Sequence, residues 1–196
     1  MTLWFWSDTH FGHENMLNFK VDRCDCGAAK EGHHGLDKIH TLECAFTKAA
    51  YVRPFNSTEE MDELMIANAH KVVRPGDHLW HLGDVTMNPS KFLKVIKRLP
   101  GIKGLVLGNH DSGTIQQYLA AGFKKIAAYR VYNNFLFSHI PIALDSKSRW
   151  DHNIHGHTHV NNLPHPFYIN VSVEQINYTP ISLEELEHLG RKQHGL

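Results

Sequence analysis

The chain has 196 residues, 42% of them hydrophobic and 20% charged, which is typical of one globular domain with a substantial core. Its 20 basic and 20 acidic side chains give a formal net charge of +0, so charge does not indicate nucleic acid or an anionic membrane as a partner. Because the sequence shows no signal-peptide pattern and no apolar run of about 18 residues, we expect a cytoplasmic, intracellular protein with a single domain over residues 1–196.

The first half of the chain predicts strands that alternate with helices. Residues 2–7 read as a strand, a short helix is expected over 12–19, and the pattern then blurs from about 20 to 53, which we interpret as an insertion or long loop. Ser57 and Glu60 fit a capping box that opens an amphipathic helix to about residue 72. The expected elements that follow are a strand at 79–82, an amphipathic helix at 92–99, a strand at 102–107 and a short helix near 114–121.

The second half is richer in adjacent strands. Strands are expected at about 126–132 and 134–138, with Asn133-Asn134 as a tight turn. Strands at 152–156 and 168–173 follow, and a capping box of Ser182 and Glu185 opens a last helix to about residue 189. This order of elements predicts an α/β (α+β) protein with mixed sheets and helices outside them.

Several of the short apolar runs stop at a small residue that is followed by a candidate metal ligand. Functional groups collect at the carboxyl ends of strands in open α/β sheets, so we expect these ligands at one rim of one sheet. Histidine, the commonest metal ligand, is also the compositional outlier with 17 copies. Carboxylate, amide and imidazole groups together suit first-row transition ions. The candidate ligands are Asp8, His10, Asp84, Asn109, His139, His157 and His159.

Each ligand motif has a plainer interpretation when it is taken alone. A Gly-Asp pair such as the one ending at Asp84 is more often a turn, and a lone His139 is more often a satisfied buried histidine. In Gly108-Asn109-His110-Asp111, His110 is a candidate proton donor that Asp111 would orient. The alternative is a strand-to-helix turn in which Asp111 caps the helix.

The ordered set of D-x-H, G-D, G-N-H-D, a strand-end His and G-H-x-H resembles the calcineurin-like metallophosphoesterase family. The resemblance covers residues 3 to about 185 apart from 20–53. The flanking Phe11-Gly12-His13, Arg53-Pro54-Phe55 and Pro180-Ile181-Ser182-Leu183 are similar to a small bacterial and phage branch. The resemblance implies a four-layer αββα sandwich, with two mixed β-sheets flanked by helices and a dinuclear metal site at the strand C-terminal ends.

The resemblance also implies a role for each site residue. One ion would be held by Asp8, His10, Asp84 and His159, and the other by Asp84, Asn109, His139 and His157. The ions would be two divalent transition metals, with Mn favoured and Zn, Fe or Ni as alternatives. His110, supported by Asp111, would protonate the leaving group. Two such ions can activate a water for direct attack at phosphorus.

Residues outside this set carry further expectations. We predict that His13, Asn15 and Arg53 bind substrate, with a surface ion pair as the alternative for Arg53. An additional structural zinc in 20–53 is a second hypothesis, although Cys-x-Cys is not the usual zinc spacing and reduced free cysteines on a loop are the alternative. Its candidate ligands are Cys24, Cys26, His33, His34 and Cys44.

We therefore expect a metal-dependent phosphoesterase, and we favour a phosphodiesterase acting on small or nucleotide-like substrates. The alternatives are a phosphomonoesterase or protein-phosphatase-like activity, and a non-catalytic binding protein on the same fold. A nuclease would need a basic groove, which the net charge does not indicate. Because the 20–53 segment follows the first ligand motif, we also expect it to shape substrate choice.

Overall fold

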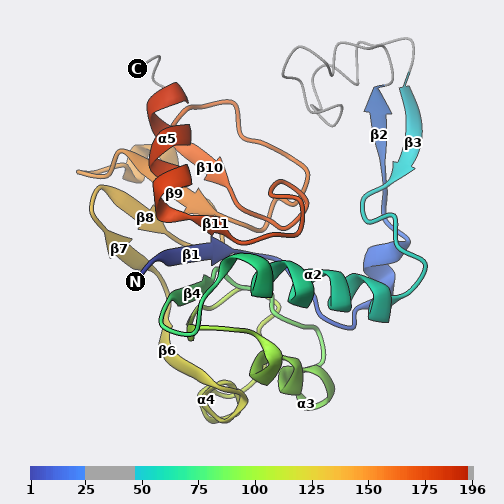
Figure 1. The fold of residues 1–196 in the computed structure, drawn as a ribbon. Coiled ribbons are helices and arrows are strands. Elements are labelled where there is room, and N and C mark those ends of the chain that lie inside the picture. The colour runs from blue at the N-terminus through green and yellow to red at the C-terminus, as the bar shows by residue number, and fades with distance from the viewer. Residues whose placement is uncertain (25–46, 194–196) are drawn as a thin grey trace.

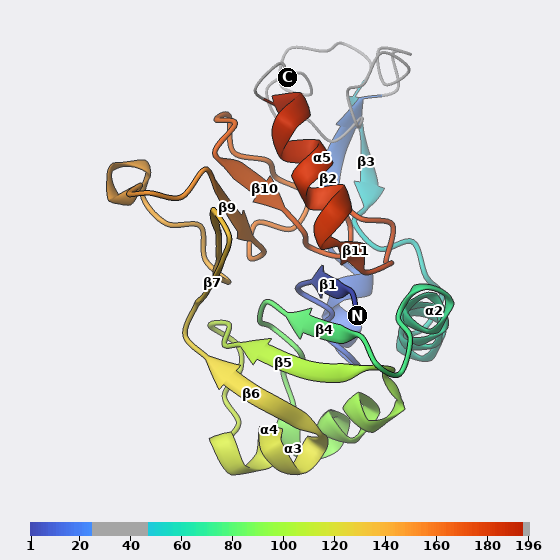
Figure 2. The same ribbon diagram turned by 60° about the vertical axis from the view of Figure 1, so that its left-hand side comes forward.

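Two mixed sheets form the body of the molecule (Figures 1 and 2). The computed structural model describes residues 1–24 and 47–193. The first sheet has the order β11-β1-β4-β5-β6, with β11 antiparallel and the other four strands parallel. Its strands are β1 (Leu3–Trp6), β4 (His78–His81), β5 (Ile102–Val106), β6 (Phe123–Ala127) and β11 (Ile181–Ser182).

The second sheet has the order β10-β9-β8-β7, in which only β7 is antiparallel to its neighbour. Its strands are β7 (Arg130–Tyr132), β8 (Phe135–Phe137), β9 (His152–His155) and β10 (Tyr168–Asn170). The two mixed sheets confirm the α+β class. The single strand expected at 126–132 is wrong, because the chain leaves the first sheet after Ala127 and starts the second at Arg130.

Three helices of the first half begin at recognisable caps. Ser57 Oγ accepts from Glu60 N at the start of α2 (Thr58–Val72), as the capping pattern predicts. The helix expected at 92–99 instead begins earlier, as α3 (Pro89–Phe92), and continues as the 3-10 helix η3 (Leu93–Arg98). The capping side chain of Asn88 and the following Pro89 explain the early start. Thr114 opens α4 (Ile115–Ala121) with a complete capping box.

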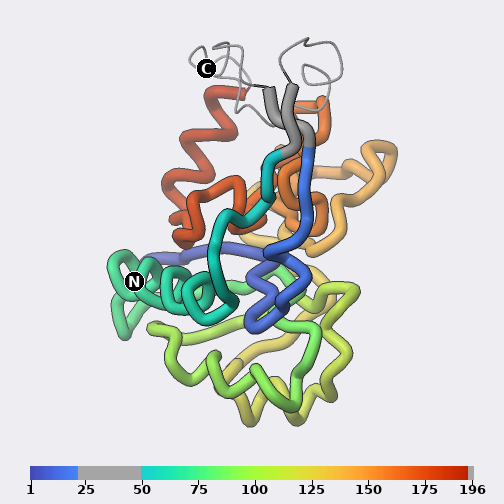
Figure 3. Tube along the Cα trace, turned by 90° about the vertical axis from the view of Figure 1, so that its right-hand side faces the viewer, coloured from blue at the N-terminus to red at the C-terminus, as the bar shows by residue number. Residues whose placement is uncertain are grey.

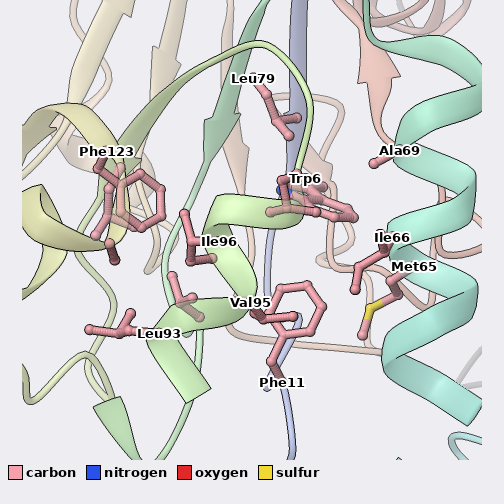
Figure 4. Packing of buried hydrophobic residues seen from close by; sticks show 14 of the residues in the cluster. Trp6, Phe11, Met65, Ile66, Ala69, Leu79, Leu93, Val95, Ile96 and Phe123 are labelled. Atoms are coloured by element: carbon pink, nitrogen blue, oxygen red, sulfur yellow. The ribbon is translucent and has the colours of Figure 1, made fainter. Parts of the chain in front are cut away.

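The first core lies between these helices and the first sheet (Figure 4). Met65, Ile66 and Ala69 project from α2 toward Trp6 of β1, and all four are buried. This face of α2 follows the i, i+1, i+4 spacing of an amphipathic helix. Burying these side chains holds α2 against the sheet.

A second core fills the space between the two sheets. Phe5 of β1 stacks on Phe137 of β8 with ring centroids 4.3 Å apart, whereas its neighbour Trp6 belongs to the first core. Successive side chains on a strand point to opposite faces, so β1 is buried on both sides. This packing fixes the rims of the two sheets relative to each other.

The last helix, α5 (Leu183–Gln193), begins at the predicted capping box, since Ser182 and Glu185 exchange hydrogen bonds. Leu186 is fully buried in the second core. The helix contacts β11 and β1 of the first sheet and β10 of the second. It therefore packs where the two sheets adjoin.

Part of the insertion expected at 20–53 is a pair of strands. Residues Lys20–Cys24 (β2) and Thr47–Tyr51 (β3) form an antiparallel pair in which Lys20 aligns with Tyr51. This hairpin stands beside the two large sheets (Figures 1 and 3), and the short 3-10 helix η1 (Glu14–Leu17) precedes it. The extra-zinc hypothesis rests on side chains outside the described residues. Within the described residues, no helix is both long and apolar enough to span a bilayer.

Candidate metal centre

The predicted ligands converge in two neighbouring groups at the ends of strands. In each group, one ligand atom from every residue lies within 4.8 Å of the others. The first group is Asp8, His10 and His159, and the second is Asp84, His139 and His157. These side chains come from the segments that follow β1, β4, β8 and β9, so the predicted proximity at strand ends is confirmed. The expectation of a single sheet is wrong, because β1 and β4 belong to the first sheet and β8 and β9 to the second.

Asp84 belongs to the second group and also lies next to the first. Its Oδ2 atom is 3.7 Å from His10 Nε2 and 3.3 Å from His139 Nε2. Asn109 Oδ1 is 2.9 Å from His139 Nε2, which places the amide beside the second group. The geometry therefore suits a carboxylate shared by two cations, with Asn109 as a further oxygen ligand.

The polar atoms of His10 show that a cation fits the first group. Its side chain is only 3% exposed, yet neither ring nitrogen has a hydrogen-bond partner. Buried polar atoms without partners are rare, since each carries a desolvation penalty. Burial and the charge of Arg53 hold the pKa of His10 well below its ordinary value. A neutral imidazole with a free lone pair beside carboxylates is suited to bind a metal ion.

Strained backbone is concentrated in the same loops. Five ligand residues are among the non-glycine residues with positive φ, a region that side chains normally avoid. Each such residue costs about 1–3 kcal/mol and persists only where surrounding contacts enforce it. The five are Asp8 (φ 59°), His10 (48°), Asp84 (58°), His157 (66°) and His159 (49°).

Two glycines lie so close to the ligand carboxylates that a larger residue would not fit. A Cβ atom on Gly108 would overlap Asp84, and one on Gly156 would overlap Asp8 and Ser7. Asp8 is also held in place by the His157 amide at 2.9 Å and by the Ser172 hydroxyl at 3.0 Å. The carboxylates are thus positioned before any ligand binds.

The structure places Asp111 differently from the expectation. Its carboxylate accepts hydrogen bonds from the amides of Asp84 (2.9 Å), Val85 (3.0 Å) and Gly108 (2.8 Å). No contact between this carboxylate and the His110 imidazole is found among the described side chains. Asp111 therefore joins the loops after β4 and β5, and its predicted role in orienting His110 is corrected. The His110 side chain is exposed, with its ring 5.9 Å from that of His10.

Arg53 does not face the substrate side. It is fully buried, and Nη1 donates to Thr9 O at 2.8 Å while Nη2 donates to Asp8 O. Its Nε and Nη2 atoms lie 2.8 and 2.7 Å from Glu174 Oε1. The prediction that Arg53 binds substrate is contradicted, because its hydrogen-bonding groups are committed inside the protein. Arg53 instead supports the backbone that presents Asp8.

Glu174 is the residue that the sequence interpretation missed. Its Oε1 accepts from His159 Nδ1 at 3.0 Å, which leaves His159 Nε2 directed at Asp8, 3.9 Å away. Burial raises the pKa of Glu174, but the charge of Arg53 and the bond to His159 outweigh it and lower that pKa to about 2. Glu174 follows the predicted strand at 168–173, so the strand-end rule could have identified it.

A cavity of about 870 Å³ opens beside the two groups. Its lining includes His10, His110 and His159. The predicted substrate residues His13 and Asn15 also line it, which places both within reach of a bound molecule. Their binding role remains a prediction.

Comparisons with known proteins extend over nearly the whole chain. No family model matches. The chain is 31% identical over 197 residues to the uncharacterized protein MJ1445 of Methanocaldococcus jannaschii, covering 95% of this chain and 89% of the relative. The crystal structure of AQ665, a protein of unknown function from Aquifex aeolicus, is similar with a TM-score of 0.61 and 29% identity, over 96% of this chain and 98% of the other. The similarity supports the mixed α/β fold, and the chemistry has to be inferred from the site.

Proposed function

We propose that this chain, which belongs to the same family as the uncharacterized M. jannaschii protein MJ1445, is a dinuclear metal-dependent phosphoesterase of the calcineurin-like type. The observation that carries the proposal is the pair of ligand groups, in which Asp84 of the second group also lies next to the first. The order of ligand motifs along the chain supports the same assignment. The family comparison itself assigns no activity.

The chain supplies ligands for two divalent transition ions, for which Mn is favoured and Zn, Fe or Ni are alternatives. When bound, such ions supply positive charge that activates a water and neutralises the phosphate. Asp8, His10 and His159 would hold one ion. The second would be held by Asn109, His139 and His157, with Asp84 shared.

His110 is the proposed proton donor. Its exposed ring lines the cavity next to the ligands, where it can reach an ester oxygen. The water oxygen bonds to phosphorus and its proton passes to solvent; as the ester P–O bond breaks, His110 gives its proton to the departing oxygen. Asp111 accepts hydrogen bonds from the amides of Asp84 and Val85, and these bonds hold the neighbouring loops together.

We favour phosphodiesters over phosphomonoesters, because the cavity of about 870 Å³ leaves room for an organic group besides the phosphate. Parallel assays on p-nitrophenyl phosphate and bis(p-nitrophenyl) phosphate, with Mn, Zn, Ni or Mg, separate the two activities. Elemental analysis of the purified protein measures metal stoichiometry independently.

The variant His110→Ala is expected to lower turnover by about 100-fold or more, the typical contribution of a general acid. His188→Ala is the matched control, because His188 is exposed on α5 away from the cavity. Two bound metals with no hydrolysis of either ester would instead support the non-catalytic binding protein. Equal activity of both variants would refute the role of His110.

A further inference from the structure

The cavity beside the ligand groups has a chemically mixed lining. Its lining includes imidazoles, among them His110 and His159, and a set of apolar side chains. The apolar residues that matter here are Met16, Phe19, Val21, Val52 and Met87. A single open space therefore joins a candidate phosphate-binding centre to an apolar surface.

The base of the β2–β3 hairpin builds much of the apolar wall. Phe19 directly precedes β2, Val21 lies within it, and Val52 directly follows β3. The Val52 amide donates to Phe19 O at 2.9 Å, which closes the hairpin at its base. Because paired backbone holds these side chains, the wall is formed before a ligand enters. Figure 3 shows the two chain segments running side by side from the body into the hairpin.

Large apolar side chains of this wall remain open to solvent. Phe19 is 53% exposed and Met87 is 40% exposed. Exposed apolar surface that adjoins a set of convergent polar groups is typical of a ligand site. An aromatic group that entered the cavity would bury part of Phe19 and stack on its ring.

Permanent positive charge is scarce among the described side chains that line the cavity. Apart from histidines, Lys20 is the one ionisable side chain among the described lining residues, and its ammonium lies 4.6 Å from the Tyr51 ring centroid. A polyphosphate chain would need several cations along its length. Asn161 and Asn162 line the cavity and offer neutral hydrogen-bonding groups instead.

We propose that the hairpin base, through Phe19, Val21 and Val52, binds the organic ester group of the substrate, and that this group is an uncharged aromatic ring system. The inference rests on the proposed function, since it places the phosphate at the ligand groups. It adds the class of substrate: a phosphoester with an aromatic substituent and no further phosphates.

The test compares two diesters with the same leaving group, bis(p-nitrophenyl) phosphate and methyl p-nitrophenyl phosphate, using the Mn-loaded protein. Phe19→Ala should lower the ratio of their kcat/KM values roughly 3- to 10-fold, as expected for the loss of one aromatic contact. Phe19→Leu should restore part of the ratio. Tyr129→Ala is the matched control, because Tyr129 is 60% exposed and does not line the cavity.

A binding measurement separates this inference from the proposed function. Calorimetry compares phenylphosphonate with methylphosphonate on the same proteins, and tighter binding of phenylphosphonate that Phe19→Ala weakens supports the aromatic site. Hydrolysis with an unchanged ester ratio and equal phosphonate affinities would overturn the inference and leave the phosphoesterase intact. If neither ester is hydrolysed, the proposed function fails, and equal phosphonate affinities would then refute the aromatic site as well.

Discussion

Replacing Glu174 with glutamine removes a negative charge from the interior with little change in volume. Glu174 Oε1 contacts both Arg53, at 2.7 and 2.8 Å, and His159 Nδ1, at 3.0 Å. The side chains of Arg53 and Glu174 are 0% and 2% exposed. The variant therefore leaves a buried guanidinium without a counter-charge, which is one of the few substitutions expected to be strongly destabilising.

The size of the effect follows from the pKa of Glu174, which falls from an ordinary 4.5 to about 2. At about 1.4 kcal/mol per pH unit, neutralising this carboxylate lowers the free energy of unfolding by about 3 kcal/mol. Because the folded-state pKa is depressed, this stabilisation is fully present above pH 4.5 and is lost as the pH falls toward 2. The difference between wild type and Glu174→Gln should shrink over the same range.

Urea unfolding at pH 7 in the presence of a chelator measures the effect without bound metal. The matched control is Glu63→Gln, which breaks another Arg–Glu pair in which both bonds to Arg98 are 2.6 Å. That pair is exposed, with side chains 50% and 59% accessible, so its loss should change stability by no more than about 1 kcal/mol. Equal free energies of unfolding for the two variants would show that the buried ion pair does not stabilise the protein more than the exposed pair does.

Two further perturbations test the packing and the electrostatics around the site. Gly156→Ala should destabilise the protein by about 2 kcal/mol and weaken Mn binding, because its Cβ would overlap Asp8. Gly76→Ala, with nothing within 4 Å of the added atom, is the control, and equal unfolding curves for the two would contradict the close approach. Burial raises the pKa of Asp62 from 3.8 to about 6, so stability should fall as the pH rises from about 4 to 6. Asp62→Asn should remove this fall, worth about 1 kcal/mol after discounting for partial exposure, whereas unfolding of Glu184→Gln, an exposed residue on α5, should follow the wild-type pH profile.

Local patterns predicted most of the secondary structure. Hydrogen-bonded caps at Ser57 and Ser182 lie where the sequence indicated, since a cap involves only residues three positions apart. The strand that was expected at 126–132 failed because β6 and β7 join different sheets. Strand propensity describes a stretch of chain and contains no information about which sheet it enters.

The strand-end positions of the ligands were also predictable, whereas their supporting contacts were not. Asp8, His139 and His159 each follow a short apolar strand, and functional groups collect at strand ends. That β1 lies in one sheet and β8 and β9 in the other, with their ends facing the same site, was not predictable from the strand pattern. The partners of Arg53 and Asp111 could not be read in this way. Arg53 pairs with Glu174 across 121 positions of chain, and Asp111 binds the amide of Asp84 across 27.

The sequence by itself determined the elements, the candidate ligands and the order in which they occur, because periodicity and strand ends are local properties. Only the tertiary structure decided that Arg53 lies inside, that Glu174 fixes His159, and that the β2–β3 hairpin supplies an apolar wall. A buried charge needs a partner, and which residue provides it depends on the segments that folding brings together.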